Sequence, residues 1–178
     1  MKLCILGGGL TGLSLAKSLV KKGLSIDIFL NKKKSDFNRS RTIGISNDNL
    51  MYFNKEILDI KKLFWDIKKI EIYSDNLRNE KILNFENNNK TVFAIIRNYQ
   101  LQSKLLKSLK KDKLCKFKQN FDYNFSNLKK YKLIINCEND NYFSKKFFAR
   151  SLKKKYDSLA YTSCLLYTSD AADDSRSV

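Results

Sequence analysis

The sequence predicts an α/β fold, built on a βαβ unit with an inserted antiparallel β meander. The first observation behind this prediction is an apolar stretch at residues 2–6, followed by a glycine cluster, a segment with helical apolar spacing and a second apolar stretch at 24–30. A strand, a turn, a helix and a strand within about 30 residues are typical of doubly wound α/β folds. The second observation is a run of strand-like segments at 68–75, 81–86 and 91–96, separated by polar turns.

The N-terminal unit is predicted element by element. Residues 2–6 (KLCIL) form a short buried strand. Apolar residues then recur at helical spacing from Leu10 to Lys22, and Gly23 is a typical signal for the end of a helix. The next strand covers residues 24–30 (LSIDIFL), which are rich in β-branched and aromatic side chains.

Further helices are predicted on either side of the meander. Residues 46–57 form one, with Ser46 or Asn47 as its N-cap. Residues 98–111 form another, whose leucines recur on a single face. Strands of weaker pattern follow at 113–118 and near Phe121 to Phe125.

The chain then reaches a buried strand at 131–137 (YKLIINC). Residues 164–178 break the pattern, because their first part, CLLYTSDAADD, resembles the translation of a transposase adapter used in sequencing libraries. We therefore expect this tail to be artefactual or disordered, and the chain to be a truncated, N-terminal fragment.

The composition limits the function classes. The net charge of +17 is carried mostly by lysines spread along the chain, and no nucleic-acid-reading motif accompanies it, so we expect no nucleic-acid partner. The sequence contains no histidine, which excludes a Ser-His-Asp arrangement within the chain. The four cysteines form no C-x-x-C pair, so we expect buried thiols and no metal site. Neither a signal peptide nor a membrane-spanning stretch is apparent, and a cytoplasmic location is expected.

The glycine cluster carries the candidate site. Gly7, Gly9 and Gly12 fit the G-x-G-x-x-G spacing between a predicted strand and a predicted helix. In such a site the first glycine permits a tight turn, the second lets the backbone approach a pyrophosphate, and the third lets the helix pack closely on the strand. The candidate phosphate-binding residues are Gly7, Gly8, Gly9, Leu10, Thr11 and Gly12.

A dinucleotide site also needs an acceptor for the ribose hydroxyls at the end of the second strand. That position falls on Leu30, which cannot accept a hydrogen bond, with Asn31 beside it as the candidate acceptor. Asp27 lies in mid-strand, and its side chain is expected to point away from the site. Residues 32–34 are lysines, which suit an additional phosphate better than a ribose diol.

Several motifs together resemble the FAD-dependent aromatic-ring hydroxylases, and most closely the ubiquinone-biosynthesis branch. After the glycine motif they are RTIGIS at 41–46, FAIIRNYQLQSKLLKSL at 93–109 and KLIINCENDN at 132–141. The resemblance covers residues 1 to about 163. It implies a Rossmann-like FAD-binding domain made of residues 1–66 and 97–163, with 67–96 as the start of a substrate-domain sheet.

The resemblance also assigns site residues. Arg41 matches the family arginine near the flavin, and Glu138 matches the acidic residue of the family's D-G motif. The family arginine that opens the later helix falls on Tyr99, with Arg97 two residues earlier as the candidate. Asn139 replaces the glycine of the D-G motif.

The resemblance implies an FAD-dependent monooxygenase in which NAD(P)H is the reductant and a small aromatic molecule is hydroxylated. No side chain of this chain is then needed as a catalytic nucleophile, because the cofactor carries the chemistry. A polyprenylated substrate would imply peripheral contact with the inner membrane, which the basic surface favours. Two alternatives remain open: a catalytically degenerate flavin-fold accessory protein, and an oxidoreductase that binds NAD(P) in place of FAD.

Overall fold

A computed structural model describes residues 2–30, 41–74, 80–88, 90–119, 129–138 and 141–147. Its N-terminal unit has the predicted order. Strand β1 (Lys2–Leu6) leads into helix α1 (Leu10–Lys21), and strand β2 (Ser25–Leu30) follows. The βαβ unit expected from the apolar pattern is therefore confirmed.

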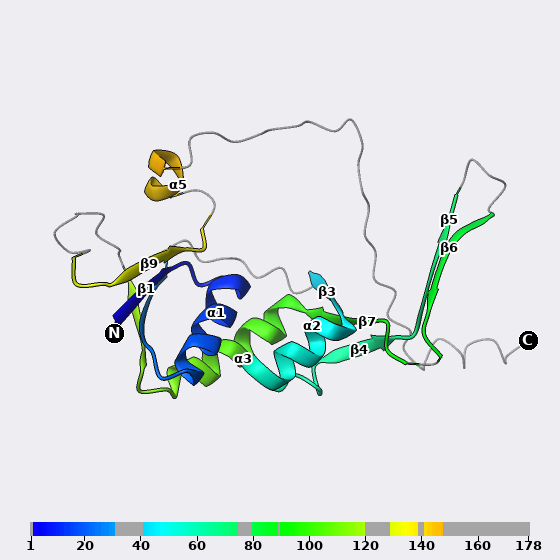
Figure 1. Cartoon of the computed structure of the whole chain (residues 1–178), viewed down its shortest axis with the longest axis horizontal. Helices are drawn as coiled ribbons and strands as arrows, with labels where there is room; N and C mark the ends of the chain where they lie inside the picture. Colours follow the sequence, from blue (N-terminus) through cyan, green and yellow to red (C-terminus); the bar gives the residue numbers. More distant parts are fainter. Residues whose placement is uncertain are drawn as a thin grey trace, which may run out of the picture.

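A parallel sheet positions the glycine turn. Strand β2 pairs on its outer side with β8 (Cys115–Gln119), and β1 pairs with β9 (Leu133–Asn136), which gives the order β8-β2-β1-β9. All of these pairs are parallel. Strands β2 and β8 thus lie on one side of β1. Strand β9 lies on the other side, next to β1 (Figure 1). In open α/β sheets such a switch point is where ligands bind, beyond the carboxyl ends of the strands.

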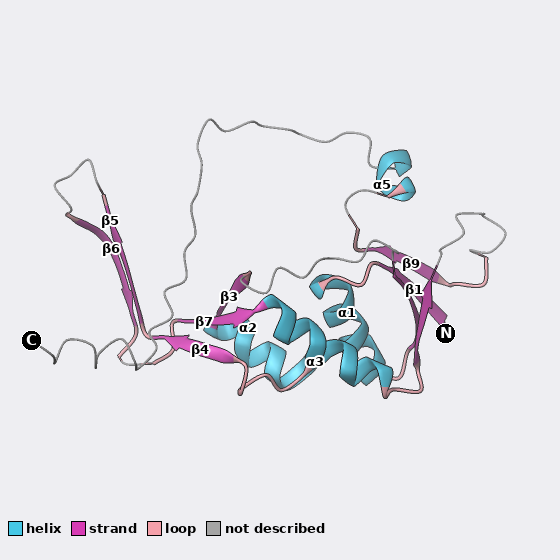
Figure 2. Cartoon of the chain, turned by 180° about the vertical axis from the view of Figure 1, so that it is seen from behind, coloured by secondary structure: helices cyan, strands magenta, loops and turns pink. Residues whose placement is uncertain are grey.

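Two helices cover one face of this sheet. Helix α3 (Asn98–Lys110) packs beside α1, as Figures 1 and 2 show from opposite sides. The leucines expected on one face of α3 are buried at positions 101, 105 and 109. They share one core with apolar side chains of α1 and of the strands, which include Leu3, Ile5, Leu13, Ala16, Val20, Ile26 and Ile28.

A second, antiparallel sheet lies on the other side of the helices. It is formed by β3 (Thr42–Ser46), β7 (Phe93–Arg97) and β4 (Phe64–Ile67), in the order β3-β7-β4. Between β3 and β4, the helix expected at 46–57 is present as α2 (Asn47–Tyr52), which continues into one turn of π-helix, η1 (Phe53–Ile57). Ser46 is its N-cap residue, as expected, although its side chain makes no capping hydrogen bond to the helix backbone.

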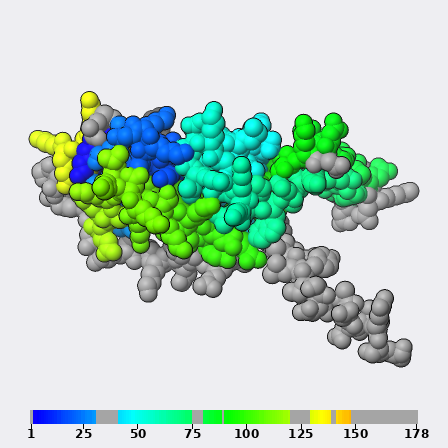
Figure 3. Space-filling view, turned by 90° about the horizontal axis from the view of Figure 1, so that it is seen from below, coloured from blue at the N-terminus to red at the C-terminus, as the bar shows by residue number. Residues whose placement is uncertain are grey.

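The inserted strands are antiparallel, but their pairing differs from a simple meander. Strands β5 (Lys69–Tyr73) and β6 (Lys81–Glu86) form a hairpin that projects from the rest of the described chain (Figures 2 and 3). Strand β7 pairs with β3 and β4 instead of β6. The reason is burial: Ala94 and Ile96 of β7 are fully buried in the core beneath the helices, whereas every residue of β6 is exposed.

Strand β9 is less buried than its sequence predicts. Leu133 keeps 51% of its surface exposed, although the apolar pattern indicated a buried strand. Among the described strands, β9 forms one edge of the parallel sheet. An edge strand has a neighbour on one side alone, so it buries less of its apolar surface than a central strand does. The weak strand expected near Phe121 to Phe125 falls outside the described residues.

The outer face of the parallel sheet, opposite α1 and α3, carries a smaller cluster made of Cys4, Leu6, Phe29 and Tyr131. Asp27 is fully buried beside it. Its Oδ2 atom accepts a hydrogen bond from the Tyr131 hydroxyl at 2.6 Å and forms ion pairs with the Lys2 and Lys118 ammonium groups at 3.1 and 2.6 Å. Burial raises the pKa of Asp27, but the hydrogen bonds from Lys118, Tyr131 and Lys2 outweigh it and hold that pKa below its usual 3.8.

The cysteines lie as expected where the structure describes them. Cys4 and Cys115 are buried free thiols, and Cys137 is a half-buried one. The described residues contain no cluster of three or more His, Cys, Asp or Glu side chains suited to a metal ion. None of the helices in this part of the chain is both long and apolar enough to cross a membrane.

Candidate dinucleotide-binding site

The glycine turn connects the carboxyl end of β1 to the N-terminus of α1. The Gly7 N–H donates a hydrogen bond to the Phe29 carbonyl at 3.0 Å, which ties the turn to the neighbouring strand β2. Gly7 has a φ of +113°, a conformation that L-residues with a side chain rarely adopt. The Leu13 N–H bonds to the Gly9 carbonyl at 3.0 Å and begins the helix.

The space around each glycine differs, and the difference matches the roles expected from the motif. A Cβ atom at Gly12 would lie 2.2 Å from the Gly7 carbonyl oxygen, so the helix sits directly against the turn. By contrast, a Cβ atom at Gly9 would meet no described atom within 4 Å. Gly9 is exposed, and its backbone therefore faces open space at the end of the sheet.

The first turn of α1 is suited to an anion. Among the described residues, no side chain caps this helix and no acidic residue lies in its first turn. The free N–H groups and the positive end of the helix dipole are thus left for another acceptor. The candidate residues Leu10, Thr11 and Gly12 form this turn, and Thr11 is exposed. These features fit the pyrophosphate of a dinucleotide.

Glu138 lies beside the turn, just beyond the end of β9. A Cβ atom built on Gly7 would come within 2.9 Å of the Glu138 Cγ atom. The Cys137 N–H donates to the Leu6 carbonyl at 2.8 Å, and the Glu138 N–H donates to Asn136 Oδ1 at 3.2 Å. The structure therefore brings Glu138 to the same switch point as the predicted phosphate residues, whereas Asn139 lies outside the described residues.

The end of β2 offers an apolar side chain at the turn. Leu30 packs against Gly8, since a Cβ atom at Gly8 would lie 2.3 Å from Leu30 Cδ2. Asp27 is on the outer face of the sheet and bonds to Tyr131, as its mid-strand position indicated. The candidate acceptor Asn31 and the lysines at 32–34 fall outside the described residues.

The two candidate arginines lie next to each other, at the junction of the antiparallel sheet with α3. Arg97 is the N-cap residue of α3 and is paired with Thr42, the neighbour of Arg41. The Arg41 carbonyl accepts a hydrogen bond from the Asn98 N–H at 3.0 Å, and the Arg41 side chain is exposed. The Arg97 guanidinium lies over the Trp65 ring, 5.3 Å from its centroid. Trp65 thus holds the Arg97 side chain by a cation–π contact.

One contact at the turn was not predicted. Gln102, on α3, donates a hydrogen bond from Nε2 to the Gly8 carbonyl oxygen at 2.9 Å. No signal in the sequence indicates it, because the contact depends on how α3 packs beside α1. Gln102 connects the helix that follows the arginines to the glycine turn.

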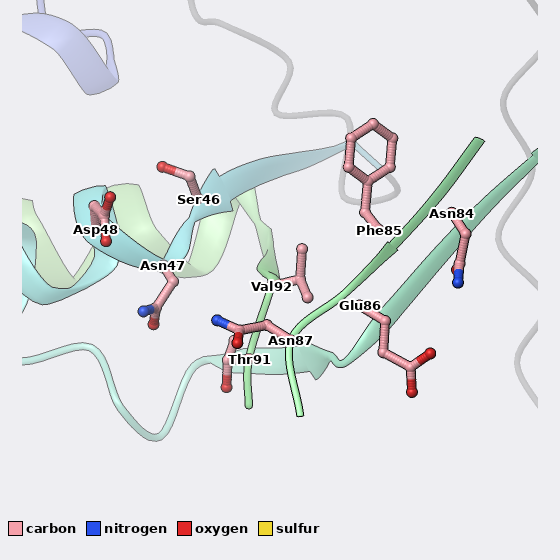
Figure 4. A pocket seen from close by; sticks show the side chains of 9 residues that line it. All are labelled: Ser46, Asn47, Asp48, Asn84, Phe85, Glu86, Asn87, Thr91 and Val92. Atoms are coloured by element: carbon pink, nitrogen blue, oxygen red, sulfur yellow. The ribbon is translucent and has the colours of Figure 1, made fainter. Parts of the chain in front are cut away.

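A separate polar pocket of about 400 Å³ lies where β3 enters α2, next to the end of β6 (Figure 4). None of the candidate site residues lines it. Its walls carry carboxylate, amide and hydroxyl groups around an aromatic ring, and they are formed by Ser46, Asn47, Asp48, Asn84, Phe85, Glu86, Asn87, Thr91 and Val92.

Comparison with known proteins finds similarity in structure alone. No protein-family model matches the chain, and no curated protein matches it in sequence. Among solved structures, PqsL from Pseudomonas aeruginosa, a probable FAD-dependent monooxygenase, superposes with a TM-score of 0.63 at 11% identity, over 88% of this chain and 48% of that one. The p-nitrophenol 4-monooxygenase PnpA from Pseudomonas putida DLL-E4 gives 0.55 at 16% identity, over 66% of this chain and 31% of that one.

HpxO from Klebsiella pneumoniae, solved with FAD and uric acid, gives a TM-score of 0.50 at 20% identity, over 66% of this chain and 30% of that one. The chain therefore spans a third to a half of the length of these solved chains. At such low sequence identity, a structural match is evidence for the fold alone. These superpositions confirm the predicted α/β class. The chain has, over that length, the fold of these three solved structures.

Proposed function

We propose that this chain carries the FAD-binding region of an FAD-dependent monooxygenase. One observation carries the proposal: the exposed backbone of Gly9 and the uncapped first turn of α1 meet at the switch point of the parallel sheet. Such a place holds the pyrophosphate of a dinucleotide. The fold shared with PqsL, a probable FAD-dependent monooxygenase, and with HpxO, solved with FAD, supports FAD as that dinucleotide.

The residues would divide the work of holding FAD. The N–H groups from Gly8 to Gly12 would bind the pyrophosphate, and Glu138 would lie next to them at the end of β9. Arg41 and Arg97 are proposed to contact the flavin part, and Asn31 the ribose. When bound, FAD would carry two electrons from NAD(P)H to dioxygen, so that one oxygen atom would enter an aromatic ring as a hydroxyl group and the other would leave as water.

The proposed substrate is a small aromatic molecule, with a polyprenylated quinone precursor as the finer assignment. Structures of neighbours contain 2-aminobenzoylacetate in PqsL and uric acid in HpxO, both small molecules. The proposed location is the cytoplasm, and the net charge of +17 would favour peripheral contact with an anionic inner-membrane surface. In this proposal residues 1–66 and 97–163 belong to the FAD-binding domain, and residues 67–96 begin the substrate-domain sheet.

A second candidate function follows from Leu30. Its methyl group packs on Gly8, at the position from which an acidic side chain would reach the ribose. Without an acidic side chain to bind the ribose, the chain fits a degenerate flavin-fold protein that serves as an accessory partner. The two candidates differ in whether the folded chain still binds FAD.

The test is a titration of the 178-residue chain with FAD and, separately, with NADPH, followed by fluorescence. We expect weak but saturable FAD binding by this fragment, and Gly9→Ala should weaken it by about tenfold or more, because the added Cβ occupies the space beside the turn. Ser18→Ala, later on the same helix, is the matched control and should bind like the parent chain. If the folded chain does not bind FAD, the result supports the accessory role. If it binds NADPH more tightly than FAD, the result supports an NAD(P)-dependent oxidoreductase.

A further inference from the structure

Gln102 makes a long-range contact with the backbone of the glycine turn. Its Nε2 atom donates to the Gly8 carbonyl oxygen at 2.9 Å, across 94 residues of sequence. The side chain is half-buried, and its helix is fixed in place by the fully buried leucines at 105 and 109. The donor is therefore presented to the glycine turn from a helix that the core holds in place.

The Gly8 carbonyl determines where the next N–H group points. A peptide unit is planar and trans, so the Gly8 C=O and the Gly9 N–H point in opposite directions. Holding that carbonyl toward Gln102 turns the Gly9 N–H away from α3. Consecutive glycines otherwise allow such a peptide to rotate, because they lack the Cβ that restricts φ and ψ.

The rest of the turn is fixed by other contacts. The Gly7 N–H bonds to the Phe29 carbonyl, and the Gly9 carbonyl accepts from the Leu13 N–H. Leu30 packs against Gly8 itself. These bonds hold the Leu6–Gly7 and Gly9–Leu10 peptides, and of the two peptide units between them Gln102 bonds to the second, Gly8–Gly9.

We propose that Gln102 is a positioning residue that orients the Gly8–Gly9 peptide, so that the Gly9 N–H is presented to the pyrophosphate of the dinucleotide. This inference rests on the proposed function, because it assumes that FAD binds at the turn. Gln102 does not itself touch the ligand in this proposal. It acts on affinity through the backbone, and the packing of α3 is left unchanged.

The test compares Gln102→Leu with the matched control Gln100→Leu in the 178-residue chain. Gln100 lies on the same helix and has no hydrogen-bonding partner for its side chain among the described residues. We expect Gln102→Leu to weaken FAD binding about fivefold to tenfold, the effect of one neutral hydrogen bond. Gln100→Leu should leave the dissociation constant and the melting temperature unchanged, and Gln102→Leu should lower the melting temperature of the ligand-free chain by no more than about 2–4 °C.

Amide hydrogen exchange supplies a second readout without any ligand. In Gln102→Leu, exchange at residues 8–10 should accelerate, while that at 101–109 stays slow. FAD affinity and exchange equal to those of the parent chain overturn the inference while leaving the proposed function standing. A larger fall in melting temperature with faster exchange throughout α3 also overturns it, in favour of a purely structural role. A folded parent chain that binds no FAD overturns the proposed function, and this inference with it.

Discussion

Replacing Asp27 with Asn tests the buried polar cluster on the outer face of the parallel sheet. The substitution keeps the size of the side chain and removes its negative charge. In the parent chain the Asp27 Oδ2 atom receives the Tyr131 hydroxyl and the ammonium groups of Lys2 and Lys118. After the substitution these groups surround a neutral amide in a fully buried position.

The magnitude follows from the exposure of the partners. Removing one member of a buried ion pair costs about 3–5 kcal/mol, because the remaining charge is left without compensation. Here the side chains of Lys2 and Lys118 keep 39% and 35% of their surface, so both can turn toward water. We therefore expect a loss of about 3 kcal/mol in the free energy of unfolding, at the lower end of that range. For a chain of this length the melting temperature should fall by roughly 6–12 °C.

The pH dependence has a fixed sign. The pKa of Asp27 is lowered in the folded chain, so its charged form stabilises the fold. That stabilisation is complete above the pKa of the unfolded state, at about 4, and is lost as the pH falls through the folded value. The stability difference between the parent chain and Asp27→Asn should thus stay constant from about pH 8 to pH 5 and shrink below about pH 4.

The assay is urea unfolding followed by circular dichroism across this pH range. Glu71→Gln is the matched control, because Glu71 also binds two lysines, Lys69 and Lys81, but on the projecting hairpin. Because solvent screens the ion pairs of Glu71 with Lys69 and Lys81, Glu71→Gln should change the free energy of unfolding far less than Asp27→Asn does. Equal effects of the two substitutions, or a difference for Asp27→Asn that persists unchanged at pH 3, would refute the reasoning.

Three further results are expected. Gly12→Ala should lower the free energy of unfolding by about 1–3 kcal/mol in urea titrations, because its Cβ would lie 2.2 Å from the Gly7 carbonyl oxygen; an unchanged midpoint contradicts this packing. Gly9→Ala should change stability by less than about 0.5 kcal/mol in the same titrations, since no described atom lies within 4 Å; a large loss would mean that the turn is closed. Burial raises the pKa of the Cys4 thiol to about 12 and that of Cys115 to about 11, so neither should react with a thiol reagent at pH 8 until the chain is unfolded, as peptide mapping by mass spectrometry can check.

The elements that the sequence predicts well are those whose burial pattern is local. In α1 and α3 the apolar spacing by itself identifies the buried face, and both helices have nearly the predicted bounds. The partner of β7 could not be predicted in this way. It depends on whether Ala94 and Ile96 reach a core that other segments build, and a strand pattern does not contain that information.

In the candidate site too, the features that depend on local sequence could be predicted, and those that depend on tertiary packing could not. The motif spacing predicts the turn from Gly7 to Gly12, because the positive φ of Gly7 and the close approach of Gly12 to the Gly7 carbonyl arise within the strand, turn and helix. The contact from Gln102 to Gly8 depends on how α3 packs beside α1, so no spacing rule indicates it. Glu138 lies between these cases, since a family resemblance selected it and the parallel pairing of β9 with β1 brings it to the turn.

The register of β2 explains why its acidic residue does not serve the site. Side chains alternate along a strand, so Ile26 and Ile28 face the helices while Asp27 faces outward to Tyr131. Shifting the strand by one residue would turn the carboxylate to the face that α1 and α3 cover, still in mid-strand, and it would remove both isoleucines from the core. Burying two such side chains stabilises the fold by about 3–6 kcal/mol. A single exposed hydrogen bond to a ribose contributes less than this. The core therefore fixes Leu30 at the turn, where the backbone of the glycines offers hydrogen-bonding groups and the strand offers no carboxylate.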